Sequence, residues 1–299
     1  MNNDRRLVGL AGLGLMGQVL GGRLIAAGFG VAGYDTDPAK IARHAERGGQ
    51  AAASLADVAR CGAIVLAVFN TDQVEDVVES AIVPVATQGE GKVVLCTSTC
   101  DPDRIAALAA RVAPKGVRFL ETPVSGTSEQ VRTGESLGLI GGDPAVAAEV
   151  KPILDALFPR RVHIGKAGDG GRAKLAVNLI LGLNRLALAE GLVFATRLGL
   201  DPAAFLAVAR DSAAYSQCMD TKGKKMVERE FKAQGFVRQS LKDMTLIRDL
   251  ATRQGQRLPA LEVNIDVLES CIRAGEGEYD NSAVVEEIRR RTGTTGSKP

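Results

Sequence analysis

Near its start the chain reads Leu7-Val-Gly-Leu-Ala-Gly-Leu-Gly-Leu-Met-Gly17, and a further apolar run continues to Ala27. This order predicts a strand, a tight turn and the first turns of a helix. In such a turn Gly12 permits the sharp change of direction and Gly14 lets the backbone approach a phosphate, while Gly17 lets the helix pack close to the strand. The free N–H groups of the first helical turn would then face a pyrophosphate.

Three spaced glycines are weak evidence in a chain that has 34 of them, so the context matters. A second strand-like run ends at Tyr34 and is followed by Asp35, about 20 residues after the glycines, as in dinucleotide-binding proteins. That carboxylate could accept both ribose hydroxyls of an adenosine, and it would repel a 2′-phosphate. The nearest cations are Lys40 and Arg43, since Thr36 is neutral. The pattern predicts a dinucleotide site that prefers NAD, with NADP possible; the alternative is a plain βαβ turn with a surface Asp.

Length and composition restrict the class of protein. A chain of 299 residues exceeds the size at which one core usually keeps growing, so two domains are expected. Hydrophobic residues make up 45%, charged residues 24%, and the net charge is +2. This charge is too small to predict a basic surface that binds nucleic acid. Aromatic residues make up 4% and Trp is absent, which also argues against a surface that stacks bases.

Residues that usually bind metals or transfer protons are few. The five cysteines are odd in number and form no C-x-x-C pair, so we expect reduced thiols in a cytoplasmic protein and no metal site. They are Cys61, Cys96, Cys100, Cys218 and Cys271. The two histidines are expected to be structural, with His44 on an exposed helix and His163 in an edge-like strand.

Strand and helix signals alternate over residues 5–120, which predicts a parallel-dominated sheet with helices on both faces. The expected strands are Leu7–Ala11, Val31–Tyr34, Ala63–Val68, Lys92–Cys96 and Val117–Glu121. The expected helices are Pro38–Gly48, Leu55–Cys61, Thr71–Val85 and Pro102–Ala113. Two more strands, Leu137–Ile140 and Val162–Ile164, should finish the sheet, with a helix over Pro144–Leu157 between them.

Polar loops follow three of these strands, at the carboxyl ends where ligands of such sheets bind. They are Phe69–Asp72, Thr97–Pro102 and Thr122–Ser128. A cleft for a cofactor and a substrate would need this arrangement. The alternative is helix capping by Thr71, Asp72, Ser98 or Asp101. The segment Ser125-Gly126-Thr127 looks least like a cap, because only a short helical signal follows it.

A glycine-rich hinge begins at Gly165 and opens into a helix that should run to about Arg197. The helix is apolar around most of its circumference, but Asn178, Asn184, Arg185 and Glu190 interrupt it. We therefore expect a buried helix rather than a membrane span, and no membrane partner.

Lys174 and Asn178 lie four residues apart in this helix and so share one face. A lysine near the start of a largely buried helix is disfavoured as a cation by the helix dipole and by desolvation. Both effects suit a lysine that transfers protons near neutral pH. The alternative is that Lys174 extends its amine to solvent.

From Gly199 onward the signals are helical only. The expected helices are Pro202–Asp211, Gly223–Glu228, Gln239–Gln254, Leu258–Ala274 and Ser282–Arg291. The predicted domains are therefore a dinucleotide-binding domain (1–164), a hinge and interdomain helix (165–198), an all-helical domain (199–292) and a tail (293–299). So much apolar helix predicts a homodimer or homotetramer.

Four motifs together resemble the β-hydroxyacid dehydrogenase family, which includes 3-hydroxyisobutyrate dehydrogenase, tartronate semialdehyde reductase and the NAD-binding half of 6-phosphogluconate dehydrogenase. The motifs are Gly12-Leu-Gly-Leu-Met-Gly17, Pro123-Val-Ser-Gly126, Gly168–Asn178 and Lys242-Asp243. The resemblance spans essentially residues 5–291. It implies a Rossmann-type α/β domain, a long interdomain helix and an all-α C-terminal domain.

The resemblance also implies residue roles and a small hydroxyacid or semialdehyde substrate. Lys174 matches the family's catalytic lysine, and Asn178 matches the asparagine that holds the substrate. The substrate loop would be Ser125, Gly126 and Thr127. The cofactor residues would be Gly12, Leu13, Gly14, Leu15, Met16, Gly17, Asp35, Val68, Phe69, Asn70, Thr99 and Lys242.

The chain departs from the family pattern at three places. Thr127 replaces a common second glycine, Val177 replaces the first of two common asparagines, and Gly134-Glu135-Ser136 stands where a Gly-Thr-Leu-like run is common. These changes leave the reaction class intact and the substrate open. One alternative function is an imine-reducing enzyme on the same plan, although those relatives usually have Asp or Tyr in place of Lys174. The other is a non-catalytic dinucleotide-binding protein.

Overall fold

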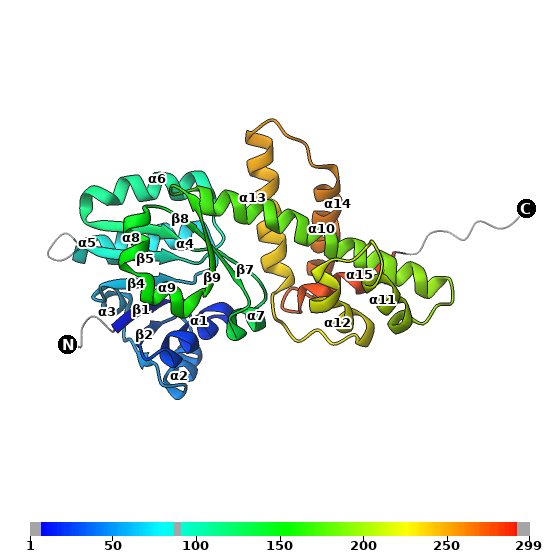
Figure 1. Cartoon of the computed structure of the whole chain (residues 1–299), viewed down its shortest axis with the longest axis horizontal. Helices are drawn as coiled ribbons and strands as arrows, with labels where there is room; N and C mark the ends of the chain where they lie inside the picture. The colour runs from blue at the N-terminus through cyan, green and yellow to red at the C-terminus, as the bar shows by residue number, and fades with distance from the viewer. Residues whose placement is uncertain (1–6, 87–90, 292–299) are drawn as a thin grey trace, which may run out of the picture. The chain divides into compact units, whose positions relative to one another are not determined.

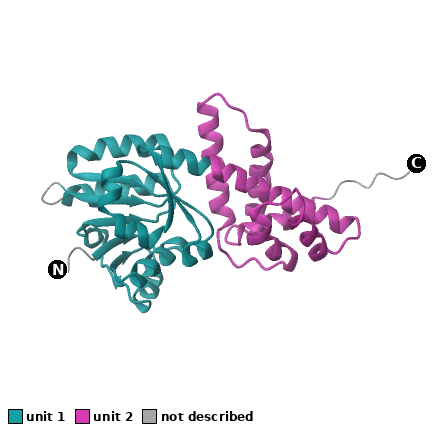
Figure 2. Cartoon of the chain, in the orientation of Figure 1, with its two compact units in different colours: residues 1–175 teal, residues 176–299 magenta. Residues whose placement is uncertain are grey.

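The computed structural model describes residues 7–86 and 91–291, and its contacts divide the chain into two compact units (Figure 2). Unit 1 comprises residues 1–175 and unit 2 comprises residues 176–299. The division falls inside one continuous helix, α10 (Asp169–Arg197). The predicted tail, 293–299, lies outside the described residues.

Unit 1 is built on a nine-stranded sheet in its described part, with the order β3-β2-β1-β4-β5-β6-β8-β7 and with β9 paired to β8 (Figure 1). The strands from β3 to β6 and the β8–β9 pair are parallel, while β6–β8 and β7–β8 are antiparallel. The predicted parallel-dominated sheet is thus confirmed. The strands are β1 (Leu7–Ala11), β2 (Gly30–Tyr34), β3 (Gln50–Ala51), β4 (Ala63–Leu66), β5 (Lys92–Cys96), β6 (Val117–Glu121), β7 (Val124–Ser125), β8 (Leu137–Gly141) and β9 (Arg160–Gly165).

The helices of unit 1 follow the predicted ranges, with one clear exception. They are α1 (Leu15–Ala26), α2 (Pro38–Glu46), α3 (Leu55–Ala59), α4 (Thr71–Asp76), a π-helical segment (Val77–Ile82), α5 (Val83–Ala86), α6 (Pro102–Val112), a short 3-10 turn (Ala113–Lys115), α7 (Ser128–Thr133), α8 (Pro144–Glu149) and α9 (Lys151–Leu157). The single helix predicted over Pro144–Leu157 was wrong, because the chain breaks at Val150. Pro152 has no N–H for the preceding turn and its ring would clash with that turn's carbonyl.

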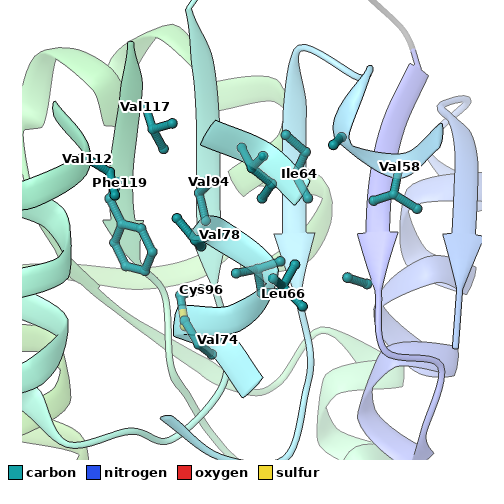
Figure 3. Close-up of a cluster of buried hydrophobic side chains, with 14 of the residues drawn as sticks. Val58, Ile64, Leu66, Val74, Val78, Val94, Cys96, Val112, Val117 and Phe119 are labelled. Atoms are coloured by element: carbon teal, nitrogen blue, oxygen red, sulfur yellow. The ribbon is translucent and has the colours of Figure 1, made fainter. Parts of the chain in front are cut away.

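Each central strand buries side chains on both faces of the sheet. Ile64 and Leu66 of β4 belong to one apolar cluster, whereas Val65 belongs to another. This alternation gives two cores, as expected for a parallel sheet that is covered on both sides. Figure 3 shows the first core, whose labelled residues are Val58, Ile64, Leu66, Val74, Val78, Val94, Cys96, Val112, Val117 and Phe119. The second core includes Leu20 and Leu24 of α1 and Leu157 of α9.

Unit 2 is helical, and in its described residues the one β contact is an isolated bridge between Phe236 and Asp280. After α10 come α11 (Pro202–Arg210), a π-helical turn (Met219–Gly223), α12 (Lys224–Glu228), α13 (Val237–Arg253), α14 (Pro259–Arg273), a 3-10 turn (Asn281–Ala283) and α15 (Val284–Arg290). A buried ion pair, Lys222 Nζ to Asp280 Oδ2 at 2.9 Å, lies inside this unit. The all-helical prediction is confirmed.

Within the described ranges, α10 is the one helix long and apolar enough to cross a membrane, with a mean hydropathy of 1.5 over its most apolar window. A core helix of a globular protein has the same composition, so this property does not distinguish the two.

Candidate active site

The glycine turn between β1 and α1 contains two glycines that packing requires. Gly12 has a φ of +92°, and a Cβ there would lie 2.5 Å from the carbonyl oxygen of Ala67. A Cβ on Gly17 would lie 2.0 Å from the carbonyl oxygen of Gly12. The absence of a side chain at Gly12 thus lets the turn pack against the backbone that follows β4, and its absence at Gly17 lets the start of α1 pack against the turn.

Gly14 has a different environment, because a Cβ there would meet nothing within 4 Å. It is the N-cap of α1, no side chain caps this helix end, and no acidic residue stands in the first turn. The N-terminus of α1 therefore lacks a side-chain cap and has open space beside Gly14, at the positive end of a helix dipole. This arrangement fits the pyrophosphate of a dinucleotide.

Asp35 lies beside the glycine turn, as the sequence pattern predicts. Its Oδ2 accepts a hydrogen bond from the Leu13 N–H at 2.8 Å, and its Oδ1 accepts one from the Asp37 N–H at 3.0 Å. Lys40 Nζ lies 3.3 Å from Oδ1. These contacts fix the carboxylate next to the phosphate-binding turn, where the ribose of a bound dinucleotide would be expected. The residues present fit the cofactor.

The loop after β4 combines capping with its predicted position at the rim of the sheet. Asn70 Oδ1 accepts from the Gln73 N–H at 2.9 Å and caps α4, while Gln73 Oε1 accepts from the Phe69 N–H at 2.7 Å. The backbone of Val68 is tied to the next loop, because Ser98 Oγ donates to its carbonyl at 2.7 Å. The cap in this loop is thus Asn70, which was predicted only as a cofactor residue, whereas the predicted capping candidate Asp101 does cap α6 by accepting from the Asp103 N–H.

The loop after β5 is held in the same way. Thr97 Oγ1 donates to the carbonyl oxygen of Leu66 at 2.7 Å, and the Asp101 N–H donates to Thr71 Oγ1 at 3.0 Å. Thr99 lies between these anchors and is buried. Side chains of one loop thus fix the backbone of its neighbour, so the rim that carries the predicted cofactor residues is cross-linked by hydrogen bonds.

The predicted substrate loop follows β6. Ser125 ends β7, and Gly126 has a φ of +149°, which favours glycine. The expectation that this segment is not a cap was wrong for Thr127. Its Oγ1 accepts from the Gln130 N–H at 3.2 Å, and its own N–H donates to Gln130 Oε1 at 2.9 Å. This capping box starts α7. The cap was not predicted because the helix after it is only six residues long and gives a weak helical signal in the sequence.

Lys174 lies in the second turn of α10 and is 7% exposed. The alternative that it extends freely into solvent is therefore wrong. The start of α10 is attached to the sheet through Glu121, the last residue of β6. Glu121 Oε2 accepts from the Gly168 N–H, and Oε1 accepts from the Gly171 N–H at 3.2 Å.

Glu121 was not predicted from the sequence. Burial raises the pKa of its carboxyl to about 7, and the hydrogen bonds from Gly168 and Gly171 oppose that rise only in part. The available signal was an acidic residue at the end of an otherwise apolar strand, directly before a polar loop. A buried carboxylate at that point needs hydrogen-bond donors from another element.

Unit 2 contains the remaining predicted residues. Asn178 is buried, and its Nδ2 donates to Asp243 Oδ2 at 2.8 Å. Lys242 Nζ lies 3.0 Å from the other oxygen of the same carboxylate. The Lys242-Asp243 motif thus fixes the side-chain amide of Asn178. The glycine turn, Asp35, the rim loops, the substrate loop and Lys174 all belong to unit 1.

The histidines have structural contacts. His44 was expected on an exposed helix face, but it is 1% exposed, and its Nε2 lies 3.1 Å from the carbonyl oxygen of Val31. It fills a space next to Gly33 and Gly49, where a Cβ would collide with its ring. His163 Nε2 lies 2.9 Å from the carbonyl oxygen of Gly142. Over the ranges 7–86 and 91–291, no three His, Cys, Asp or Glu side chains gather as a metal site would require, and the five cysteines are free and buried.

The glycine turn, the open N-terminus of α1 and the acid after β2 define the dinucleotide-binding domain of an oxidoreductase. Comparison with known families supports this class over both units. Residues 7–165 match the NAD binding domain of 6-phosphogluconate dehydrogenase, and residues 168–288 match the NAD-binding domain of NADP-dependent 3-hydroxyisobutyrate dehydrogenase. The chain belongs to the β-hydroxyacid dehydrogenase family.

Individual relatives agree with this assignment. L-threonate dehydrogenase of Cupriavidus necator is 29% identical over 282 residues, which cover 94% of this chain and 95% of the relative. 2-(Hydroxymethyl)glutarate dehydrogenase of Eubacterium barkeri is 28% identical over 292 residues, 97% of each chain. The crystal structure of 3-hydroxyisobutyrate dehydrogenase from Salmonella typhimurium superimposes with a TM-score of 0.84 at 27% identity, covering 94% of this chain and 99% of that one. This chain is accordingly an NAD(P)-dependent oxidoreductase.

Proposed function

We propose that this oxidoreductase interconverts a small β-hydroxyacid and its aldehyde or keto acid, with Lys174 as the general acid and base. The observation that carries the proposal is the burial of Lys174 in the second turn of α10, in a chain of this family. Its amine would donate a proton to the carbonyl oxygen during reduction and take it back during oxidation. When bound, the nicotinamide supplies the hydride-transfer chemistry.

Other residues would orient the substrate. The proposed contacts are Ser125 and the backbone of Gly126 for the carboxylate, and the amide of Asn178 for the hydroxyl or carboxylate. The hydroxyl of Thr127 already caps α7, so this residue would shape the loop rather than donate to substrate. Asp243 fixes the orientation of Asn178 through the 2.8 Å hydrogen bond. Such positioning of the reacting groups lowers the entropic cost of reaching the transition state.

The test compares Lys174→Ala with Lys166→Ala, a variant of an exposed lysine in the hinge before α10. Turnover is measured on L-threonate, 3-hydroxyisobutyrate and 2-(hydroxymethyl)glutarate, and NADH binding is measured by fluorescence titration. We expect Lys174→Ala to lose about 10²-fold or more in kcat while its Kd for NADH stays within about twofold. Lys166→Ala should retain activity. Full activity in Lys174→Ala would refute the mechanism, and cofactor binding without turnover of any acid would favour the non-catalytic alternative.

Within NAD(P), we infer a preference for NAD. The support is Asp35, whose charge beside Leu13 opposes a 2′-phosphate, although Lys40 offsets part of that charge at 3.3 Å. The experiment titrates NADH and NADPH into the wild type, Asp35→Ala and Lys40→Ala. Asp35→Ala should reduce or reverse the preference for NADH, and Lys40→Ala should increase it. Equal affinities in all three proteins would contradict the role of Asp35.

Imine reduction is not favoured, because the relatives at 28–29% identity include hydroxyacid dehydrogenases, whereas the matching imine reductase structures are only 14–19% identical, and because the chain retains Lys174. For the assembly we propose a cytoplasmic homodimer or homotetramer that binds neither nucleic acid nor membrane. Support comes from exposed apolar side chains on α10, with Ile180 at 61% and Phe194 at 65%, and just after it, with Leu198 at 63%. Light scattering on the wild type and on Phe194→Glu tests it, since a monomeric wild type would exclude the proposed assembly.

A further inference from the structure

Glu121 is a buried acid with a closely fitted environment. It is 3% exposed and pairs in register with Gly141 of β8. A Cβ on Gly141 would lie 2.7 Å from Glu121 Oε2, and a Cβ on Gly171 would lie 2.8 Å from Oε1. A Cβ on Gly170 would lie 3.3 Å from the Cβ of Glu121. Three glycines on two elements therefore leave the room that this side chain occupies.

The charged and titratable groups around Glu121 come from two elements. On α10, Asp169 raises the pKa of the carboxyl and Arg172 lowers it. The guanidinium of Arg172 also forms an ion pair with Asp103, with 2.7 Å between Arg172 Nη2 and Asp103 Oδ1. On β5, the pKa of the Cys96 thiol is raised. The largest cause is its hydrogen bond with Cys100, and the negative charge of Glu121 contributes as well. In β8, Gly141 presents no charge.

The two hydrogen bonds of Glu121 connect the sheet to the helix that carries Lys174. The amides of Gly168 and Gly171 precede and begin α10, and Lys174 follows Gly171 by less than one helical turn. Both amides are first-turn or pre-helical donors without a partner inside the helix. A carboxylate at a helix N-terminus also interacts favourably with the helix dipole.

We propose that Glu121 is a positioning residue, whose ionised carboxylate fixes the first turn of α10 and thereby the amine of Lys174; this inference rests on the proposed role of Lys174. The two oxygens of the carboxylate each accept one amide. After protonation one oxygen becomes a hydroxyl, which is a poor acceptor, so one of the two contacts is lost. Because burial raises the pKa of Glu121 to about 7, the change falls in the neutral range.

The decisive variant is Glu121→Gln, which keeps the shape and one acceptor oxygen but cannot ionise. The matched control is Asp143→Asn, where a carboxylate that caps α8 from an exposed position is also replaced by its amide. For each protein, kcat and KM are measured from pH 6 to 9 with the hydroxyacid of highest turnover, together with the Kd for NADH. Hydrogen exchange of the segment 166–175 is measured over pH 6 to 8.

We expect kcat of the wild type to rise through an ionisation near neutral pH. In Glu121→Gln that ionisation should disappear, and kcat at pH 8 should fall about tenfold, because small displacements of a reacting group are costly. The Kd for NADH should stay within about twofold, and Asp143→Asn should follow the wild type in every measurement. Protection of segment 166–175 should increase as the wild type is taken above pH 7, and this increase should be absent in Glu121→Gln.

Retention of the neutral ionisation in Glu121→Gln, with kcat within about twofold of the wild type, would overturn the proposal. If Glu121→Gln does not fold, the wild type alone still decides: protection of segment 166–175 that does not change with pH relative to segment 15–26 overturns it. Failure of the proposed function is a separate result. It would show as full activity of Lys174→Ala, while the exchange of segment 166–175 would still report the Glu121 contacts.

Discussion

The stability of the protein should depend on the ionisation of Glu121. The pKa of its carboxyl is about 7 in the folded protein, against an ordinary value of 4.5. The folded state therefore binds this proton more tightly than the unfolded state, and the group favours folding fully below pH 4.5. That contribution is lost as the pH rises through 7. With about 1.4 kcal/mol for each unit of pKa, the full loss amounts to about 3.5 kcal/mol.

The measurement is urea unfolding of the wild type and Glu121→Gln from pH 5 to 8.5, with Asp143→Asn as the control. The side-chain amide that this substitution introduces cannot satisfy both backbone donors, so the variant carries a cost of about 1 to 3 kcal/mol that does not depend on pH. The test is therefore how the difference in unfolding free energy between wild type and variant changes with pH, and not the size of that difference at one pH. Relative to the variant, the wild type should lose about 2 to 3 kcal/mol between pH 5 and 8.5. Parallel profiles for the two proteins would refute the reasoning, since Glu121 would then titrate as an exposed acid does.

Three further predictions concern other parts of the chain. Gly17→Ala should destabilise the protein by at least about 1 to 3 kcal/mol in urea unfolding, because its Cβ would meet a backbone carbonyl at 2.0 Å. Gly14→Ala should fold normally but weaken NADH binding about tenfold in a fluorescence titration. Thr127→Ala should lose about 1 kcal/mol of stability in urea unfolding through the missing cap, and Thr127→Ser should restore it. Lys222→Met should cost about 3 to 5 kcal/mol in thermal unfolding by leaving Asp280 buried and unpaired, and adding Asp280→Asn should recover part of that loss.

The sequence was informative wherever a local pattern has one physical solution. The glycine turn and Asp35 are such a case, because the spacing predicted the sharp turn at Gly12, whose φ is positive, and an acid that lies beside this turn. Lys174 and Asn178 could be placed on one helix for the same reason. Whether a polar side chain serves a ligand or a helix end was less predictable: Asn70 and Thr127 both cap helices.

Contacts between distant segments could not be predicted from one chain. The burial of His44 depends on the absence of side chains at Gly33 and Gly49, and its own helix reads as amphipathic and exposed. The role of Glu121 depends on the amides of Gly168 and Gly171, which no local pattern connects to β6. The break at Val150 was readable in principle from the proline that follows, but the apolar periodicity continued through it.

The glycines around Glu121 have a consequence for the evolution of the chain. At Gly171 the nearest obstacle to a methyl group is the Glu121 carboxylate at 2.8 Å, and the next is the side chain of Pro102 at 3.2 Å. A descendant that exchanged Glu121 for a shorter residue would therefore be largely released from the need for glycine at 171. Gly141 would stay fixed, because a methyl group there would also meet the backbone nitrogen of Gly170 at 2.8 Å. Substitutions at positions 121 and 171 should therefore be coupled: Glu121 must be replaced by a shorter residue before a side chain can be accepted at position 171.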